Sequence, residues 1–439
     1  MDRKRFKGAE TALKTADQFL CDTFQISPAI AEFVEKTMGE LQPQFAEYQE
    51  ICEINSYKVI RAFRDCGVSS RHFYGTTGYG YSDEGREKLG EVFAEIFGAE
   101  RALVSPLISS GTHAINIALF GLLRPLDTLF SITGRPYDTL STAIGLDGEE
   151  GNGSLRDFAV QYRQCDLING RIDIDTVLDT LYIDKKIKIV YIQRSRGYEL
   201  RPAIRIDEIA EVIRRVKEKF PEVYIVVDNC YGEFCETREP TEVGADVIIG
   251  SLIKNPGAGI APTGAYIAGT QKAIRLISQR MTCAGIGDEI GSYLAGYLPF
   301  FQGIYFAPGV VKNALCGATL SAAVFSKLGY EVFPTASAKR SDITQAILTK
   351  TENELVELIR AVQKASPIDS NVVPYPWDMP GYQDKVIMAA GSFIQGSSIE
   401  LSADAPIKKP YVAYFQGGLT LENIKLALML ALTYMKVPV

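Results

Sequence analysis

Short apolar runs bounded by turn residues recur through the middle of the chain. Most are rich in valine and isoleucine and do not alternate with polar residues, which is typical of strands buried on both faces of a sheet. Stretches with helical spacing lie between several of them, so the pattern predicts a largely parallel sheet covered by helices. The seven runs are residues 101–104, 128–133, 157–164, 187–193, 223–228, 246–251 and 264–269.

The pattern differs on either side of this region. Residues 28–66 show helical periodicity, which Pro43 is expected to interrupt, and residues 71–87 form a loop rich in glycine and tyrosine. From about residue 310, a long helix precedes isolated strands and helices, which predicts a smaller α+β domain. We therefore expect three parts: an N-terminal helical segment and loop (1–85), a large α/β domain with a mostly parallel seven-stranded sheet (86–309) and a small C-terminal domain (310–439).

Composition and charge narrow the class of protein. The chain has 439 residues and a net charge of -7, and its basic residues are spread along the sequence, so we expect no nucleic-acid partner. Its eight cysteines form no CxxC pair, which predicts free thiols and no metal site. No apolar signal-peptide core and no run of 18 apolar residues occur, so we expect a cytoplasmic protein without a membrane partner.

Two charged residues follow neighbouring apolar runs where strands should end. Asp228 ends the run 223–228, and Lys254 lies in GSLIKNPGAG (250–259), directly after the next run. The carboxyl ends of parallel strands border the crevice in which α/β proteins bind ligands, although a turn-capping acid and a solvated lysine are open alternatives. A lysine drawn into such a crevice would lose proton affinity and could act as a nucleophile.

A third feature is the helix start SSGTHA (109–114). Its hydroxyl residues can cap the helix, and Gly111 lets backbone N–H groups face an anion. Together with Asp228 and Lys254, it offers a phosphate site, an acid for a pyridinium nitrogen and an amine for an aldehyde. These are the needs of pyridoxal 5'-phosphate (PLP), and Ser251 could add a hydroxyl group to the phosphate site.

The segments SSGTHA, VVDNCYGEF and GSLIKNPGAG resemble the fold-type I PLP enzymes of cysteine and methionine metabolism. Over most of the chain, including RHFYGTTGYGYSD and QRSRGY, the sequence is similar to the methionine gamma-lyase-like proteins often called aluminium resistance proteins. The resemblance implies the fold-type I transferase fold, with Lys254 bonded to PLP and later moving a substrate proton, and Asp228 paired with the pyridine nitrogen. The residues that it assigns to the phosphate are Ser110, Gly111, Thr112 and Ser251.

The resemblance also assigns roles to tyrosines. Tyr137, in TGRPYDTL, would place its ring on the cofactor, although a core or turn tyrosine is nearly as good an interpretation. Tyr79 or Tyr81 would reach the phosphate of a neighbouring subunit. The resemblance therefore implies a homodimer or homotetramer with shared active sites.

One departure from the family pattern concerns the substrate carboxylate. Many carbon-sulfur lyases hold it with an arginine near the end of the chain, but no arginine follows Arg360 here, and Tyr414 lies roughly at the expected place. Arg194 and Arg196, after the run 187–193, are alternatives because a guanidinium binds a carboxylate through two parallel bonds. Loop arginines also form surface ion pairs, so both interpretations stay open.

The sequence thus predicts a PLP-dependent carbon-sulfur lyase that acts by beta- or gamma-elimination on a sulfur-containing amino acid of the cystathionine, methionine or cysteine class. Another PLP reaction, such as transamination, aldol cleavage or decarboxylation, stays open because the terminal arginine is missing. A third alternative is a non-catalytic PLP-binding protein, against which the intact Lys254 and Asp228 argue.

Overall fold

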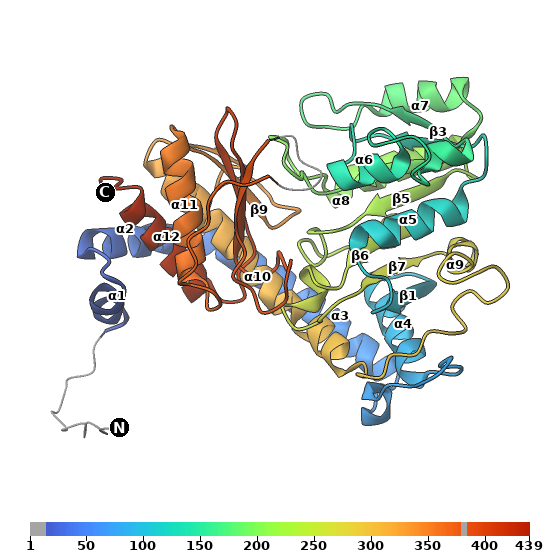
Figure 1. Cartoon of the computed structure of the whole chain (residues 1–439), viewed down its shortest axis with the longest axis horizontal. Helices are drawn as coiled ribbons and strands as arrows, with labels where there is room; N and C mark the ends of the chain where they lie inside the picture. The colour runs from blue at the N-terminus through green and yellow to red at the C-terminus, as the bar shows by residue number, and fades with distance from the viewer. Residues whose placement is uncertain (1–14, 379–383) are drawn as a thin grey trace.

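A large sheet dominates the computed structural model, which describes residues 15–378 and 384–439 (Figure 1). Its strand order is β1-β7-β6-β5-β4-β2-β3, and only β7 runs antiparallel to both of its neighbours. This confirms the mostly parallel seven-stranded sheet predicted from the apolar runs. The strands are β1 (Arg101–Ser105), β2 (Thr128–Ser131), β3 (Gln161–Gln164), β4 (Ile187–Gln193), β5 (Tyr224–Asp228), β6 (Val247–Ser251) and β7 (Ala265–Gly269).

Only the run 157–164 differs clearly from its prediction. Its first residues belong to a 3-10 turn, Leu155–Phe158, and the strand begins later, at Gln161. The Asp157 carboxylate accepts backbone N–H bonds from Gly151 and Gly153, which closes the turn before the strand can start. β3 then forms an edge of the sheet and is mostly exposed, so it lacks the double burial of the other strands.

Helices cover both faces of this sheet. The helices of the chain are α1 (Ala16–Phe24), α2 (Pro28–Glu40), α3 (Gln42–Asp65), α4 (Glu84–Phe97), α5 (Gly111–Leu122), α6 (Asp138–Ile144), α7 (Ile174–Ile183), α8 (Ile206–Lys219), α9 (Gln271–Ser278), α10 (Leu298–Lys327), α11 (Glu352–Ala365) and α12 (Leu421–Tyr434). α5, α6 and α9 share one apolar cluster with the strands, and α4, α7 and α8 share another. Strand β5 contributes Val226 to the first cluster and Ile225 and Val227 to the second, as a strand buried on both faces must.

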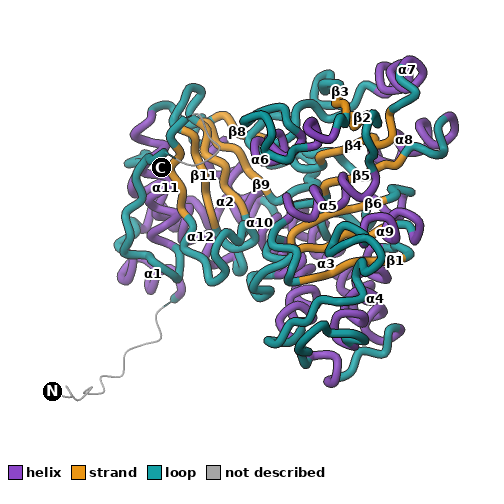
Figure 2. The backbone as a smooth tube through the Cα atoms, turned by 45° about the vertical axis from the view of Figure 1, so that its right-hand side comes forward, coloured by secondary structure: helices purple, strands orange, loops and turns teal. Residues whose placement is uncertain are grey.

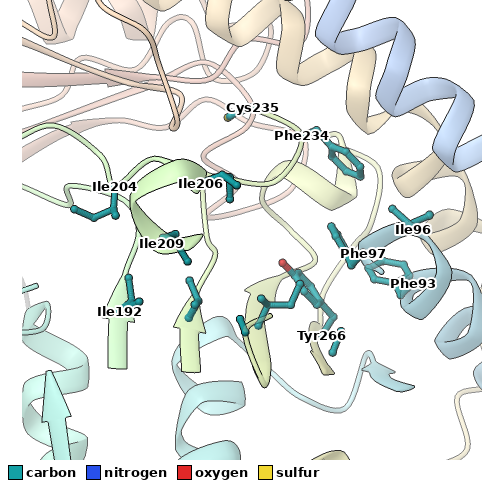
Figure 3. Close-up of a cluster of buried hydrophobic side chains, with 14 of the residues drawn as sticks. Phe93, Ile96, Phe97, Ile192, Ile204, Ile206, Ile209, Phe234, Cys235 and Tyr266 are labelled. Carbon is teal, nitrogen blue, oxygen red and sulfur yellow. The ribbon is translucent and has the colours of Figure 1, made fainter. Parts of the chain in front are cut away.

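Aromatic rings form part of the apolar cluster that contains α4, α7 and α8 (Figure 3). The ring of Phe97 from α4 stacks on Tyr266 of β7 with 5.0 Å between centroids, and Phe234 packs on the other side of Phe97 at 5.7 Å. These contacts fix the loop that follows β5, and this loop carries several of the residues discussed below.

The smaller part of the molecule contains an antiparallel sheet of order β10-β11-β12-β9-β8 (Figure 2). Helices α11 and α12 pack together against it. The predicted N-terminal segment divides between the two parts, since α2 joins the apolar cluster of the small sheet while α3 joins that of the large sheet. The strands are β8 (Glu331–Phe333), β9 (Thr344–Leu348), β10 (Val386–Ala389), β11 (Ser402–Pro406) and β12 (Val412–Gln416).

The long helix α10 connects the two parts and lies against α3 (Figure 1). By length and composition, it is the one helix of the described residues that could cross a membrane. However, 72% of its most apolar window is buried inside the protein. Its apolar character is therefore explained by its place in the core.

Candidate active site

Asp228 and Lys254 come together at the carboxyl edge of the large sheet. Asp228 is the last residue of β5, and Lys254 follows β6, the strand that pairs in parallel with β5. The Asp228 carboxylate is buried and accepts the backbone N–H of Cys230 at 3.1 Å. The Lys254 ammonium lies 4.1 Å from the centre of the Tyr231 ring. The charges of Asp228 and Lys254 also act on one another, so the two strand ends bring these side chains into one neighbourhood.

The N-terminus of α5 faces the same place. Ser110 caps this helix by accepting the N–H of His113 at 3.1 Å. A Cβ atom on Gly111 would lie 3.4 Å from the Cys230 thiol and 3.5 Å from Cβ of buried Ser251, so the helix start lies directly against β6 and the β5 loop. The first N–H groups of a helix lack partners within it and attract anions, so this cradle fits a phosphate group.

Tyr137, which precedes α6, is part of the same group of residues. Its hydroxyl lies 3.0 Å from the hydroxyl of Thr112, and its backbone N–H donates to the side chain of Gln193 at 3.2 Å. Burial, supported by the negative charge of Asp228, raises the pKa of Tyr137, while the contacts with Thr112 and Lys254 oppose the shift. The phenol is therefore neutral and available as a hydrogen-bonding and stacking group.

The charges of Asp228 and Lys254 depend on one another. Burial raises the pKa of Asp228, whereas Lys254 and the Cys230 N–H lower it. For Lys254, burial favours the neutral amine, but Cys230, Tyr231 and Asp228 outweigh it, and the pKa lies well above its ordinary range. The expected loss of proton affinity is therefore wrong for the protein alone, because acidic neighbours surround the amine.

Sequence analysis missed Tyr231 as a site residue, although it lies within the quoted segment VVDNCYGEF. Its backbone has φ 70°, in the left-handed region that bulky residues rarely adopt. This conformation holds the ring beside the Lys254 ammonium. The hydroxyl of Tyr191, also missed, donates to Asp228 at 3.5 Å from the adjacent strand β4. The contact between Tyr191 and Asp228 becomes apparent only from the order of strands in the sheet.

Comparisons with known proteins identify the family of this chain. The sequence model described as methionine gamma-lyase matches residues 30–436. The chain belongs to the methionine gamma-lyase family. Within this family, the uncharacterised protein YnbB of Bacillus subtilis (strain 168) is 49% identical over 402 residues, which cover 90% of this chain and 95% of YnbB.

Solved structures of relatives have the same fold. A protein of Clostridium acetobutylicum, described as a candidate cystathionine beta-lyase involved in aluminum resistance, is 46% identical with a TM-score of 0.93, covering 97% of this chain and 99% of its own. The carbon-sulfur lyase involved in aluminum resistance from Clostridium novyi NT is 44% identical with a TM-score of 0.92, covering 96% and 99%. Cystathionine gamma synthase of Xanthomonas oryzae pv. oryzae, at 16% identity over 80% of this chain and 86% of its own, shares the fold with a TM-score of 0.55.

Tyr79 and Tyr81 lie on an exposed loop that precedes α4. Their rings are 5.6 Å apart and are 68% and 65% exposed. The loop is fixed by bonds from the Gly291 N–H to the Tyr79 carbonyl and from the Ser292 hydroxyl to Gly78. Both side chains are thus exposed on a loop held in place by hydrogen bonds. Their contact with the phosphate in a neighbouring subunit stays a prediction.

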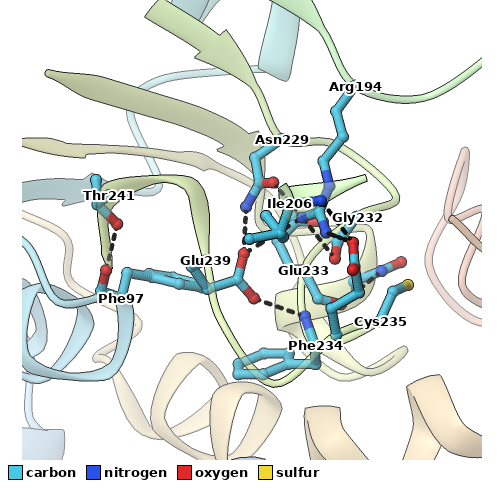
Figure 4. A network of polar contacts seen from close by, with 12 residues as sticks. Phe97, Arg194, Ile206, Asn229, Gly232, Glu233, Phe234, Cys235, Glu239 and Thr241 are labelled. Carbon is cyan, nitrogen blue, oxygen red and sulfur yellow. Dashed lines mark hydrogen bonds and ion pairs between the residues drawn. The ribbon is translucent and has the colours of Figure 1, made fainter. Parts of the chain in front are cut away.

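Arg194 is held by a buried polar network (Figure 4). Its guanidinium donates to Asn229 at 2.7 Å and to Glu236 at 3.0 Å, and it lies 3.5 Å from Glu239. Burial disfavours its charge, but Glu236 and Glu239 outweigh this and raise the pKa of Arg194. With two acids already paired to it, Arg194 has a structural role, and its substrate role stays a prediction.

Arg196 and Tyr414 lie near one another between the two parts of the molecule. Arg196 is buried, donates to the Phe333 carbonyl at 2.6 Å and has one acid, Asp342, at 3.7 Å. Burial lowers the pKa of Arg196, and Asp342 and Tyr414 compensate only in part. Tyr414 donates its hydroxyl to the carbonyl of Tyr198, on the loop after β4. Arg196 is thus the less neutralised of the two arginines.

Proposed function

We propose that this protein is a PLP-dependent carbon-sulfur lyase that cleaves a sulfur-containing amino acid by beta- or gamma-elimination. Family membership supports carbon-sulfur chemistry, and the names of the two Clostridium relatives point to the same class. The observation that carries the proposal is the meeting of Asp228, Lys254 and the N-terminus of α5 at one edge of the sheet.

The residues present fit PLP. The α5 N-terminus, with Gly111 and Thr112, would bind the phosphate, Asp228 would lie at the pyridine nitrogen and Lys254 would bond to the aldehyde. When bound, PLP supplies an electron-withdrawing ring that stores the charge left by loss of the substrate alpha proton. The intact Lys254 and Asp228 argue against a non-catalytic PLP-binding role.

The protein's own residues then carry the proton chemistry. Lys254 Nζ takes the proton from the substrate alpha carbon, and the nearby acidic groups hold that proton on the nitrogen. The carboxylate of Asp228 would balance positive charge at the pyridine nitrogen of bound PLP. The neutral side chain of Tyr137, whose hydroxyl is bonded to Thr112, would orient the ring of bound PLP without adding charge.

Arg196 is our choice for the substrate carboxylate. It has a single acid at 3.7 Å, whereas Arg194 is paired with two acids. A buried guanidinium that is only partly neutralised favours an incoming anion. Replacement Arg196→Lys should raise KM more than it lowers kcat, and an unchanged KM would exclude this role.

The proposal is tested by product analysis with cystathionine, methionine and cysteine. The purified protein should release a thiol or hydrogen sulfide, together with a keto acid and ammonia. Lys254→Ala should abolish the release, whereas Lys272→Ala should not, since Lys272 is exposed and pairs with Glu222 on the surface. A keto acid without thiol would instead favour transamination, and equal activity of Lys254→Ala would reject the catalytic role.

We also propose a homodimer or larger homo-oligomer in which Tyr79 or Tyr81 completes the site of a neighbouring subunit. The exposure of both rings supports this. Inactive Lys254→Ala and an inactive variant of Tyr79 should regain activity when they are mixed and reassembled, because one site in the mixed dimer is then intact. A mixture that stays inactive although mixed dimers form would contradict shared sites.

A further inference from the structure

Glu233 is a buried acid behind the candidate active site. It lies in the loop after β5 and is 0% exposed. One carboxylate oxygen accepts the hydroxyl of Tyr266 at 2.9 Å, and the other has no partner among the described residues. Space for this carboxylate depends on Gly250, where a Cβ atom would lie 2.4 Å from the bonded oxygen. The packing thus holds Glu233 in one place.

A chain of donors ends at this carboxylate. Arg194 donates to Asn229, Asn229 donates to the Tyr266 hydroxyl at 3.5 Å, and Tyr266 donates to Glu233 (Figure 4 shows the first part). The other acid beside this chain, Glu239, is paired with Arg194. Among the ion pairs of residues 15–378 and 384–439, none includes Glu233. An unpaired buried carboxylate is costly, whereas a buried carboxylic acid is not.

Glu233 is also attached to the turn that carries Lys254. The next residue, Asn255, is buried and donates its side-chain N–H to the Glu233 carbonyl at 3.0 Å. The side-chain oxygen of Asn255 is a buried acceptor without a partner in the described chain. A proton on the free oxygen of the Glu233 side chain would turn an unpaired acceptor into a donor.

The surroundings of Glu233 also favour its protonated form. Burial, supported by Glu239, raises the pKa of Glu233 to about 8, and the Tyr266 hydroxyl and Lys254 oppose this shift. Burial raises the pKa of the Cys230 and Cys235 thiols, and the charge of Glu233 adds to both shifts.

We propose that Glu233 is a positioning residue for Lys254 and that its side chain is uncharged in the resting protein. When Glu233 loses its proton in alkaline solution, its new negative charge makes Lys254 bind its own proton more tightly. Below about pH 8, the backbone carbonyl of Glu233 holds Asn255, next to Lys254, and the neutral side chain adds no competing charge. Above it, the new carboxylate stabilises the ammonium form of Lys254 and lowers the fraction available as a base. Only this last consequence for turnover rests on the proposed lyase function.

The first test measures stability and needs no substrate. Because the folded pKa is above the unfolded one, the contribution of Glu233 is present at acidic pH and is lost as pH rises through about 8. The urea midpoint of the wild type should therefore fall relative to Glu233→Gln between about pH 5 and about pH 9. The exposed Glu222→Gln should follow the wild type, and parallel curves for the wild type and Glu233→Gln would overturn the proposal.

The second test measures turnover of the purified enzyme. Gln keeps the acceptor for Tyr266 without a titrating proton, so kcat of Glu233→Gln should exceed that of Glu233→Ala by at least about tenfold. The wild type should lose kcat on the alkaline side of about pH 8, and Glu233→Gln should not. An alkaline loss shared by both proteins, or equal damage from Gln and Ala, would overturn the positioning role. If the protein proves not to be a lyase, the stability test still decides the charge of Glu233.

Discussion

Replacement of Arg194 by methionine separates its structural role from a substrate-binding role. The guanidinium is fully buried and paired with Glu236 at 3.0 Å and Glu239 at 3.5 Å. Methionine fills much of the same volume but leaves Glu239 without its cation and Glu236 with only the more distant Arg205, at 3.9 Å. Breaking a buried pair in this way costs roughly 3–5 kcal/mol. Since native proteins have total stabilities of about 5–15 kcal/mol, this is a large part of the whole.

Urea unfolding followed by fluorescence and circular dichroism measures this loss as a lower unfolding midpoint. The double variant Arg194→Met/Glu239→Gln should recover part of it, because one stranded acid is removed. The control Arg214→Met should change stability by less than ~1 kcal/mol, since Arg214 is 60% exposed and pairs with Glu211 on the surface. If Arg194→Met unfolds like the wild type and only raises KM, the structural interpretation is refuted and Arg194 binds substrate.

Two further substitutions test the packing and charge of the interior. Burial raises the pKa of Asp404 to about 6, so its contribution to stability is present at low pH and is lost as pH rises through that value. Asp404→Asn should therefore be more stable than the wild type at neutral pH by up to ~3 kcal/mol, measured by urea unfolding at several pH values, and equal stability throughout would contradict the assigned burial. Gly250→Ala places a methyl group 2.3 Å from the Tyr266 ring and should cost about 1–3 kcal/mol in the same assay. The helical Gly309→Ala, with open space around it, should instead be neutral or stabilising, and similar losses for both glycines would show that the close contact is not the cause.

The sequence was most informative where a local pattern determines the outcome. Doubly buried strands leave continuous apolar runs, so β4, β5 and β6 were predicted to within a residue or two, and the strand ends placed Asp228 and Lys254 on the same edge. The start of α5 was equally clear, because Ser110 and Gly111 form a recognisable cap. Each of these features depends on residues that are close together in the chain.

What the sequence could not provide depends on residues that are far apart in the chain. The sequence left Arg194 open between a carboxylate binder and a surface ion pair, because its buried partners, Glu236 and Glu239, follow only after another helix and strand. The proton affinity of Lys254 was expected to fall because the apolar run before it indicates burial. The acidic groups around the amine, which raise its pKa instead, cannot be recognised from that run. Tyr191 reaches Asp228 only because β4 and β5 are neighbours in the sheet.

The central claim is that the side-chain nitrogen of Lys254 bonds to PLP. The most direct measurement is borohydride reduction of the purified protein, followed by proteolysis and mass spectrometry of the peptides. We predict that the visible absorption disappears and that one peptide, the one containing Lys254, gains the mass of the reduced cofactor. A cofactor attached to another lysine, or a protein purified with PLP in the medium that carries none, would contradict the account.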